Sequence, residues 1–121
     1  MLARLVEMFG HMGEGAIFVC IDGADPRSTV IDALAKLSAR KIKPCHAAIA
    51  DEAHPAVPID PENGGAGVSL WINHLKRIAS DEYRLEGGYR CGIDCSEGLE
   101  FLVREEGSEW VITFQTSLWI S

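Results

Sequence analysis

The clearest pattern of hydrophobic positions lies in residues 100–118 and predicts a β-hairpin. Two runs rich in β-branched and aromatic residues flank a short polar turn, in which Gly107 can take the positive φ that a tight hairpin needs. With Glu106 and Gly107 at the tip, three apolar pairs face each other: Val103 with Trp110, Phe101 with Ile112, and Leu99 with Phe114. Because strand side chains alternate between faces, these pairs share one face. We expect the hairpin to be the platform on which the other elements pack.

Helical spacing of apolar residues predicts three helices in the remaining chain. The first begins at Leu2 and ends near Gly10. The second starts at Asp25-Pro26, an N-cap followed by proline at the first helical position, and ends near Arg40. The third covers Val68 to Tyr83, where the apolar stripe is wide.

Unbroken or alternating apolar runs predict further strands. The run Ala16–Ile21 is typical of a central strand covered on both faces. Residues 44–50 are expected to form a short parallel strand beside it, and residues 89–93 a strand leading into the hairpin. The proline- and glycine-rich residues 51–67 indicate a long, mobile surface loop. The predicted fold is a single α+β domain over residues 1–121, with three helices packed on one mixed or antiparallel sheet that ends in a C-terminal hairpin or meander.

Acidic residues are concentrated on and beside the predicted hairpin. The net charge is −7, and residues 81–109 hold nine acids against three arginines, a balance of −6. Such a surface repels phosphate backbones and attracts basic proteins, so nucleic acid is not an expected partner. A solvated face that keeps a small protein soluble is the alternative interpretation. The predicted partner-binding carboxylates are Asp94, Glu97, Glu100, Glu105, Glu106 and Glu109.

The leading functional hypothesis is a small acidic binding protein that neutralises a basic protein partner. Carboxylates on a rigid strand platform would steer that partner and occupy the positions where phosphates would bind. In size and charge, the chain is comparable to toxin-immunity proteins that block a nuclease-type active site. Anti-CRISPR-type inhibitors are an alternative of the same kind. On this hypothesis the protein is not an enzyme and needs no cofactor.

A small enzyme or ligand-binding domain is the second hypothesis. Asp22 and Asp25 follow the predicted central strand, where α/β proteins often place ligands, and His46 would join them from the neighbouring strand. Residues 51–67 would then close over the ligand as a lid. A homodimer joined through Leu118, Trp119 and Ile120 is a third alternative.

The four cysteines are expected to be free, reduced thiols in a cytoplasmic protein. Their spacing is not that of a small secreted disulfide scaffold. A zinc ion held by Cys45, His46, Cys91 and Cys95 is the alternative, although zinc sites usually show closer, repeated pairs. No stretch approaches the ~20 apolar residues of a membrane span, and the start of the chain lacks a basic secretory leader.

Overall fold

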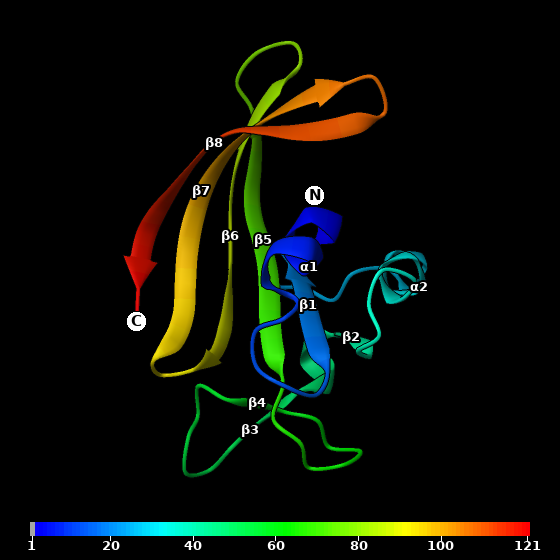
Figure 1. The fold of residues 1–121 in the computed structure, drawn as a ribbon, viewed down its shortest axis with the longest axis vertical. Helices are drawn as coiled ribbons and strands as arrows, with labels where there is room; N and C mark the ends of the chain where they lie inside the picture. Colours follow the sequence, from blue (N-terminus) through cyan, green and yellow to red (C-terminus); the bar gives the residue numbers. More distant parts are fainter. Residues whose placement is uncertain (1) are drawn as a thin grey trace.

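A six-stranded mixed β-sheet organises the protein in a computed structural model, which describes residues 2–121 except for the side chains of residues 74 and 75. The strand order is β2-β1-β5-β6-β7-β8 (Figure 1). These strands are β1 (Ile17–Ile21), β2 (Ile42–Pro44), β5 (Val68–Arg77), β6 (Glu82–Gly92), β7 (Cys95–Glu106) and β8 (Glu109–Ile120). The short strands β3 (Ile49–Ala50) and β4 (Pro58–Ile59) pair separately, and the helices are α1 (Leu2–Phe9), α2 (Ser28–Ala35) and the 3-10 turn η1 (Cys45–Ala47).

The sheet has a parallel end and an antiparallel end. Strand β1 is parallel to both β2 and β5, whereas β5, β6, β7 and β8 form an antiparallel meander. The first predicted helix, the central strand at residues 16–21 and the meander of the C-terminal strands β6, β7 and β8 are therefore confirmed. The predicted strand beside β1 exists but is shorter and earlier, because the chain leaves it at Pro44 and turns through η1.

The prediction of three helices on a sheet is wrong: the described chain is mainly β, with two short α-helices. Residues 68–77 form strand β5 in place of the third helix. In β5 the side chains of Val68, Leu70 and Ile72 are buried, so the real period is two and not 3.6. Apolar residues on both faces of this strand fill a helical stripe equally well, which is why the pattern is ambiguous.

The hydrophobic core lies between the two helices and one face of the sheet. Helix α1 contributes Leu2, Leu5 and Val6, which are buried, and α2 contributes Leu34. The sheet residues of this core are Ile17, Val19, Ile42, Val68, Leu70, Ile72, Leu85, Tyr89, Leu99, Phe101 and Val103. Phe18 is also fully buried, but it points to the opposite face, where a Cβ at Gly67 would touch its ring.

The C-terminal hairpin forms with a register that differs from the predicted one. Val103 pairs with Ile112 and Glu105 with Trp110, so the tip is Gly107-Ser108. A bulge between Leu102 and Val103 then shifts the pairing again, which places Phe114 opposite Leu102. Bulges bend a strand, and Figure 1 shows both strands turning sharply near the tip. Phe114 therefore leaves the core face and is 51% exposed.

Two tryptophans stack across the sheet over a pair of glycines. The register aligns Trp71, Gly88, Gly98 and Trp119 in one row over four strands. The two indoles are 6.0 Å apart and inclined by 13°. A Cβ on Gly98 would collide with the Trp119 indole, and one on Gly88 would lie 2.8 Å from the Trp71 ring. Glycine is needed at both positions so that the indoles can meet over the central strands.

The predicted mobile loop is pinned to the sheet by a buried ion pair. The Lys43 ammonium on β2 lies 2.9 Å from the Asp60 carboxylate, which is only 2% exposed, and 2.9 Å from that of Glu62. Asp60 also accepts the backbone N–H of Glu62 and closes a turn with Gly64. The second half of the 51–67 segment is therefore held against β2 by specific contacts.

Candidate functional sites

The six predicted partner-binding carboxylates do not gather into one surface. Asp94 precedes β7 and Glu106 ends it, so they are separated by 12 residues, a span of about 40 Å in extended chain. Glu97 and Glu100 lie between them on opposite faces. Glu97 faces Tyr89, where burial first and the Glu97 carboxylate second raise the pKa of the phenol. A single continuous docking surface built from all six residues is not present.

Three of the carboxylates do come together at the hairpin tip. Glu105, Glu106 and Glu109 are exposed and surround the two-residue turn. The Arg104 guanidinium lies 2.7 Å from Glu106 and offsets its charge. The tip therefore carries a small acidic cluster of three carboxylates. Arg104 pairs with Glu106, and Glu105 and Glu109 are outside this ion pair. This cluster can attract a basic group but is too small to select a partner by itself.

The feature that sequence reasoning understated is the outer edge of β8. This 12-residue strand is the last in the sheet and pairs with β7 alone among the described residues. It carries no lysine, arginine or proline, the residues that commonly protect an edge from pairing. Four large apolar side chains near its C-terminal half are exposed: Phe114 at 51%, Leu118 at 49%, Trp119 at 41% and Ile120 at 71%. The predicted apolar contact surface at residues 118–120 extends this edge, and a long unpaired edge can accept another strand.

Only part of the predicted catalytic set is assembled. His46 Nδ1 lies 2.9 Å from Asp25 Oδ1, and the His46 backbone N–H donates to the same oxygen at 2.9 Å. That backbone hydrogen bond, followed by the imidazole, holds the pKa of Asp25 below its ordinary value. Asp25 is therefore a partner of His46 and not the predicted cap of α2, since α2 begins at Ser28. Asp22 lies elsewhere, in a turn with φ 49°.

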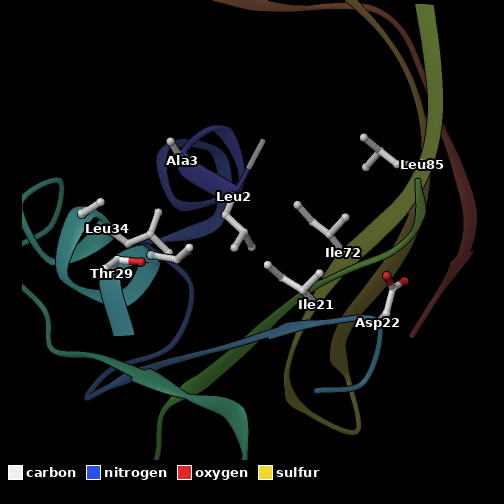
Figure 2. Close-up of a pocket in the computed structure, with 10 residues that line it drawn as sticks. Leu2, Ala3, Ile21, Asp22, Thr29, Leu34, Ile72 and Leu85 are labelled. Atoms are coloured by element: carbon white, nitrogen blue, oxygen red, sulfur yellow. The ribbon is translucent and has the colours of Figure 1, made fainter. Parts of the chain in front are cut away.

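Asp22 instead lines an apolar cavity between the helices and the sheet. The cavity has a volume of about 530 Å³, and its lining includes neither Asp25 nor His46. In Figure 2, Ala3 and Leu2 lie above it, Thr29 and Leu34 lie on α2, and Asp22 lies at the far end. The apolar lining comes from α1, α2, β1, β5 and β6, five elements far apart in the sequence, and no local motif points to it. The loop of residues 51–67 does not cover this cavity: Val68 pairs with Ile17 at the start of β1, whereas Asp22 follows its end.

The prediction of free thiols is wrong, because all four cysteines are paired. Disulfides join Cys20 to Cys45 and Cys91 to Cys95. The first follows from the parallel register, which aligns Val19 with Pro44 and so places the next residues side by side. Among the described residues, no group of possible metal ligands joins Cys45 and His46 to Cys91 and Cys95, so the zinc set proposed from sequence is not assembled. The described residues hold a different group of possible metal ligands, namely Asp25, Cys45 and His46.

Comparisons of the chain with protein-family models, with curated proteins and with solved structures find no match. Within residues 2–121, neither α-helix has the length and apolar character needed to cross a bilayer.

Proposed function

We propose that this protein is an acidic binding protein that docks a basic protein partner along the outer edge of β8. The observation that carries the proposal is the length and exposure of that edge, with four large apolar side chains in one strand. Pairing of a partner strand would satisfy the backbone groups of the edge and bury these side chains. Neutralisation of a toxin by occupation of its active site, as in toxin-immunity proteins, is the form of this function that we favour. Inhibition of an anti-CRISPR kind is the alternative.

The charges around the edge favour a basic partner. Glu97 and Glu100 on β7 pair with Ile120 and Thr116 of β8, so carboxylates flank the apolar strand on both faces. Glu109 begins the strand and Glu105 lies next to it at the tip. A partner segment with alternating apolar and basic residues would match both features. The acidic residues thus act as flanking charges, and not as the whole binding surface.

The same charges disfavour a homodimer formed edge to edge. Two copies paired along β8 would bring the carboxylates of both chains together, and each chain carries a net charge of −7. Burial of the apolar side chains would favour such a dimer. The repulsion between the carboxylates outweighs this only at low ionic strength, because added salt screens it. Light scattering at low and high salt tests this alternative. A stable dimer at both salt concentrations would contradict a free β8 edge.

The proposal is tested by purifying the partner from the native host and measuring its affinity with the pure proteins. The variant Phe114→Lys/Leu118→Lys places charges on the edge without touching the buried core. We expect it to weaken binding at least about 100-fold, the size of a lost interface centre. A matched control, Glu7→Gln/Glu52→Gln, changes the net charge by the same +2 away from β8 and should bind as the unmodified protein does. Equal affinity of the edge variant and the control would overturn the proposal.

A second candidate function is the binding of a small apolar ligand in the cavity beneath α1 and α2. Its volume of about 530 Å³ and the apolar residues around Asp22 support this candidate, since ligand sites are typically apolar hollows of a few hundred Å³ with few polar groups. Ala33→Phe should fill part of the cavity and lower the affinity for an apolar fluorescent probe. Unchanged probe binding by Ala33→Phe would contradict the cavity as the binding site. The β8 edge variant serves as the control.

A further inference from the structure

We infer that reduction of the Cys20–Cys45 disulfide creates a zinc site, with Cys20, Cys45, His46 and Asp25 as its four ligands. Two thiolates, an imidazole and a carboxylate are ligand types that Zn²⁺ accepts in tetrahedral sites. In the oxidised protein the two sulfur atoms are bonded to each other and cannot act as thiolates. The inference therefore concerns a site that opens and closes with the redox state of one disulfide, and it is independent of the proposed β8 docking edge.

The measured separations fit a tetrahedral zinc ion. Cys45 Sγ lies 3.5 Å from Asp25 Oδ1 and 3.8 Å from His46 Nδ1, and those two atoms are 2.9 Å apart. Zn–S bonds of about 2.3 Å and Zn–N or Zn–O bonds of about 2.0 Å give tetrahedral edges of about 3.5, 3.5 and 3.3 Å for the same three pairs. The three ligand atoms need to move by only a few tenths of an ångström to accept the ion.

Cys20 is positioned to supply the fourth ligand. Its Cα lies 5.2 Å from that of Cys45, because the parallel pairing of β1 with β2 holds these two strands side by side. Two thiolates on one tetrahedral zinc are about 3.8 Å apart, so the sulfur atoms separate by a side-chain rotation after the bond is broken. The backbone of β1 and β2 can stay in place during this change.

A supporting hydrogen bond orients the carboxylate ligand before the metal arrives. The backbone N–H of His46 donates to Asp25 Oδ1 at 2.9 Å, and outer-shell contacts of this kind fix ligands in metal sites. The side chains of His46 and Asp25 are 67% and 43% exposed, so a hydrated ion can reach them from solvent. Cys20 and Cys45 are half-buried.

The chemistry of opening and closing balances with a dithiol reductant and a peroxide oxidant. Reduction transfers two electrons and two protons from the dithiol to the Cys20–Cys45 bond, which becomes two thiols while the reductant becomes a disulfide. Zinc then displaces the two thiol protons. Hydrogen peroxide takes two electrons from the thiolates, the S–S bond re-forms, and the peroxide leaves as water with two protons from solvent while Zn²⁺ is released.

The test is a titration of the reduced and oxidised full-length protein with Zn²⁺ against a chromophoric chelator, followed by Co²⁺ as a spectroscopic probe. We expect the reduced protein to bind a single zinc ion per chain, and its Co²⁺ form to show sulfur-to-metal charge-transfer bands and tetrahedral d–d bands. The oxidised protein should bind at least 100-fold more weakly. Absence of zinc binding by the reduced protein, or equal binding in both redox states, would overturn the inference.

Variants separate this site from the second disulfide. His46→Ala changes an exposed side chain, so the fold is retained. We expect the zinc affinity to fall by more than the roughly 10–100-fold that the loss of a supporting outer-shell group causes. Cys45→Ser should weaken metal binding and lower the intensity of the charge-transfer bands of bound Co²⁺ by roughly half, because Cys20 remains as the one thiolate. The control Cys91→Ser/Cys95→Ser removes the other disulfide and should bind zinc as the unmodified chain does. Retained binding in His46→Ala and Cys45→Ser, or its loss in the control, would place the metal elsewhere and refute the assignment.

Discussion

The two ends of the sheet are built in opposite ways. At the β2–β1 end the strands are short and parallel, a disulfide joins Cys20 to Cys45, and Lys43 and Asp60 form a buried ion pair. At the β8 end the last strand is 12 residues long, carries a bulge and exposes four large apolar side chains. One end is fixed by cross-links and burial, and the other presents unpaired backbone to solvent.

This difference separates the parts that stabilise the fold from the parts that can bind. Elements with many buried contacts open only with the whole protein, whereas exposed edges open or pair at small cost. The β8 end is tied down chiefly by the meander itself and by the stacking of Trp119 on Trp71. We therefore expect substitutions at the β2–β1 end to change stability and those at the β8 end to change binding.

The largest expected difference in stability is between alanine variants of two phenylalanines, one at each end of the sheet. Phe18 is fully buried on β1, and Phe114 is 51% exposed on β8. Phe18→Ala should lower the free energy of unfolding by about 3–5 kcal/mol, the usual cost of a truncated buried aromatic residue, while Phe114→Ala should change it by no more than about 0.5 kcal/mol. Urea unfolding measures both. Equal losses in the two variants would show that the β8 end is part of the core.

The next effect is a pH dependence that belongs to the β2–β1 end. The Lys43 ammonium first, and then the backbone N–H of Glu62, lower the pKa of Asp60, while Asp60 and Glu62 raise that of Lys43. The lowered pKa means that the Asp60 contribution is present above about pH 4, near its ordinary value, and is lost as the pH falls through the folded value. The Lys43 contribution is present below about pH 10.4 and is lost as the pH rises through its folded value.

We therefore expect Asp60→Asn to be less stable than the unmodified protein at pH 7, with the difference shrinking as the pH falls below about 4. The urea midpoint at several pH values measures this. Asp51→Asn is the matched control in the same segment, where Asp51 Oδ1 accepts the backbone N–H of Ala53. This variant should keep the pH dependence of stability of the unmodified protein. A constant gap between Asp60→Asn and the unmodified protein at all pH values would contradict the role of the ion pair.

The sequence predicts the ends of this molecule unequally. Helix α1, strand β1 and the meander follow from simple periodicity, because each has one dominant apolar pattern. Strand β5 was predicted as a helix because it is apolar on both faces: Trp71 belongs to the indole stack and Leu70 to the core. An apolar stripe of that width satisfies both periods, and only the partner strands decide between them.

The candidate sites could be predicted only in part. The approach of His46 to Asp25 was expected from the neighbouring strands and is confirmed, whereas the meeting of Cys45 with Cys20 depends on the register of β1 with β2. The predicted hairpin register was wrong at the turn, because the tip is Gly107-Ser108 and not Glu106-Gly107. The bulge beside Leu102 then adds a further residue to β8 that no pairing rule signals. Thr113 explains it afterwards, since its hydroxyl donates to the Leu102 carbonyl at 3.2 Å. The exposure of Phe114 follows from this one residue.

A smaller effect is expected from the glycines beneath the indole stack. A Cβ on Gly98 would occupy the space of the Trp119 indole, so Gly98→Ala should displace Trp119 and cost about 1–3 kcal/mol, as overpacking does. The displaced indole should also change the intrinsic fluorescence. Gly92→Ala is the matched control on β6, because its nearest neighbours would be 3.9 Å away. A silent Gly98→Ala would mean that Trp119 does not hold β8 to the sheet.

The smallest expected effect is the loss of the ion pair at the hairpin tip, which contrasts with the buried pair at the other end. Glu106 and Arg104 are 50% and 41% exposed in their side chains, so water and salt screen their attraction. Glu106→Gln should therefore change the free energy of unfolding by less than about 0.5 kcal/mol in urea unfolding experiments, and added salt should reduce this difference further. The two ion pairs have similar distances, so this result beside that of Asp60→Asn compares an exposed pair with a buried pair that has further hydrogen bonds. A loss above about 1 kcal/mol in Glu106→Gln would instead mean that the tip contributes to folding, and the division between a stabilising end and a binding end would fail.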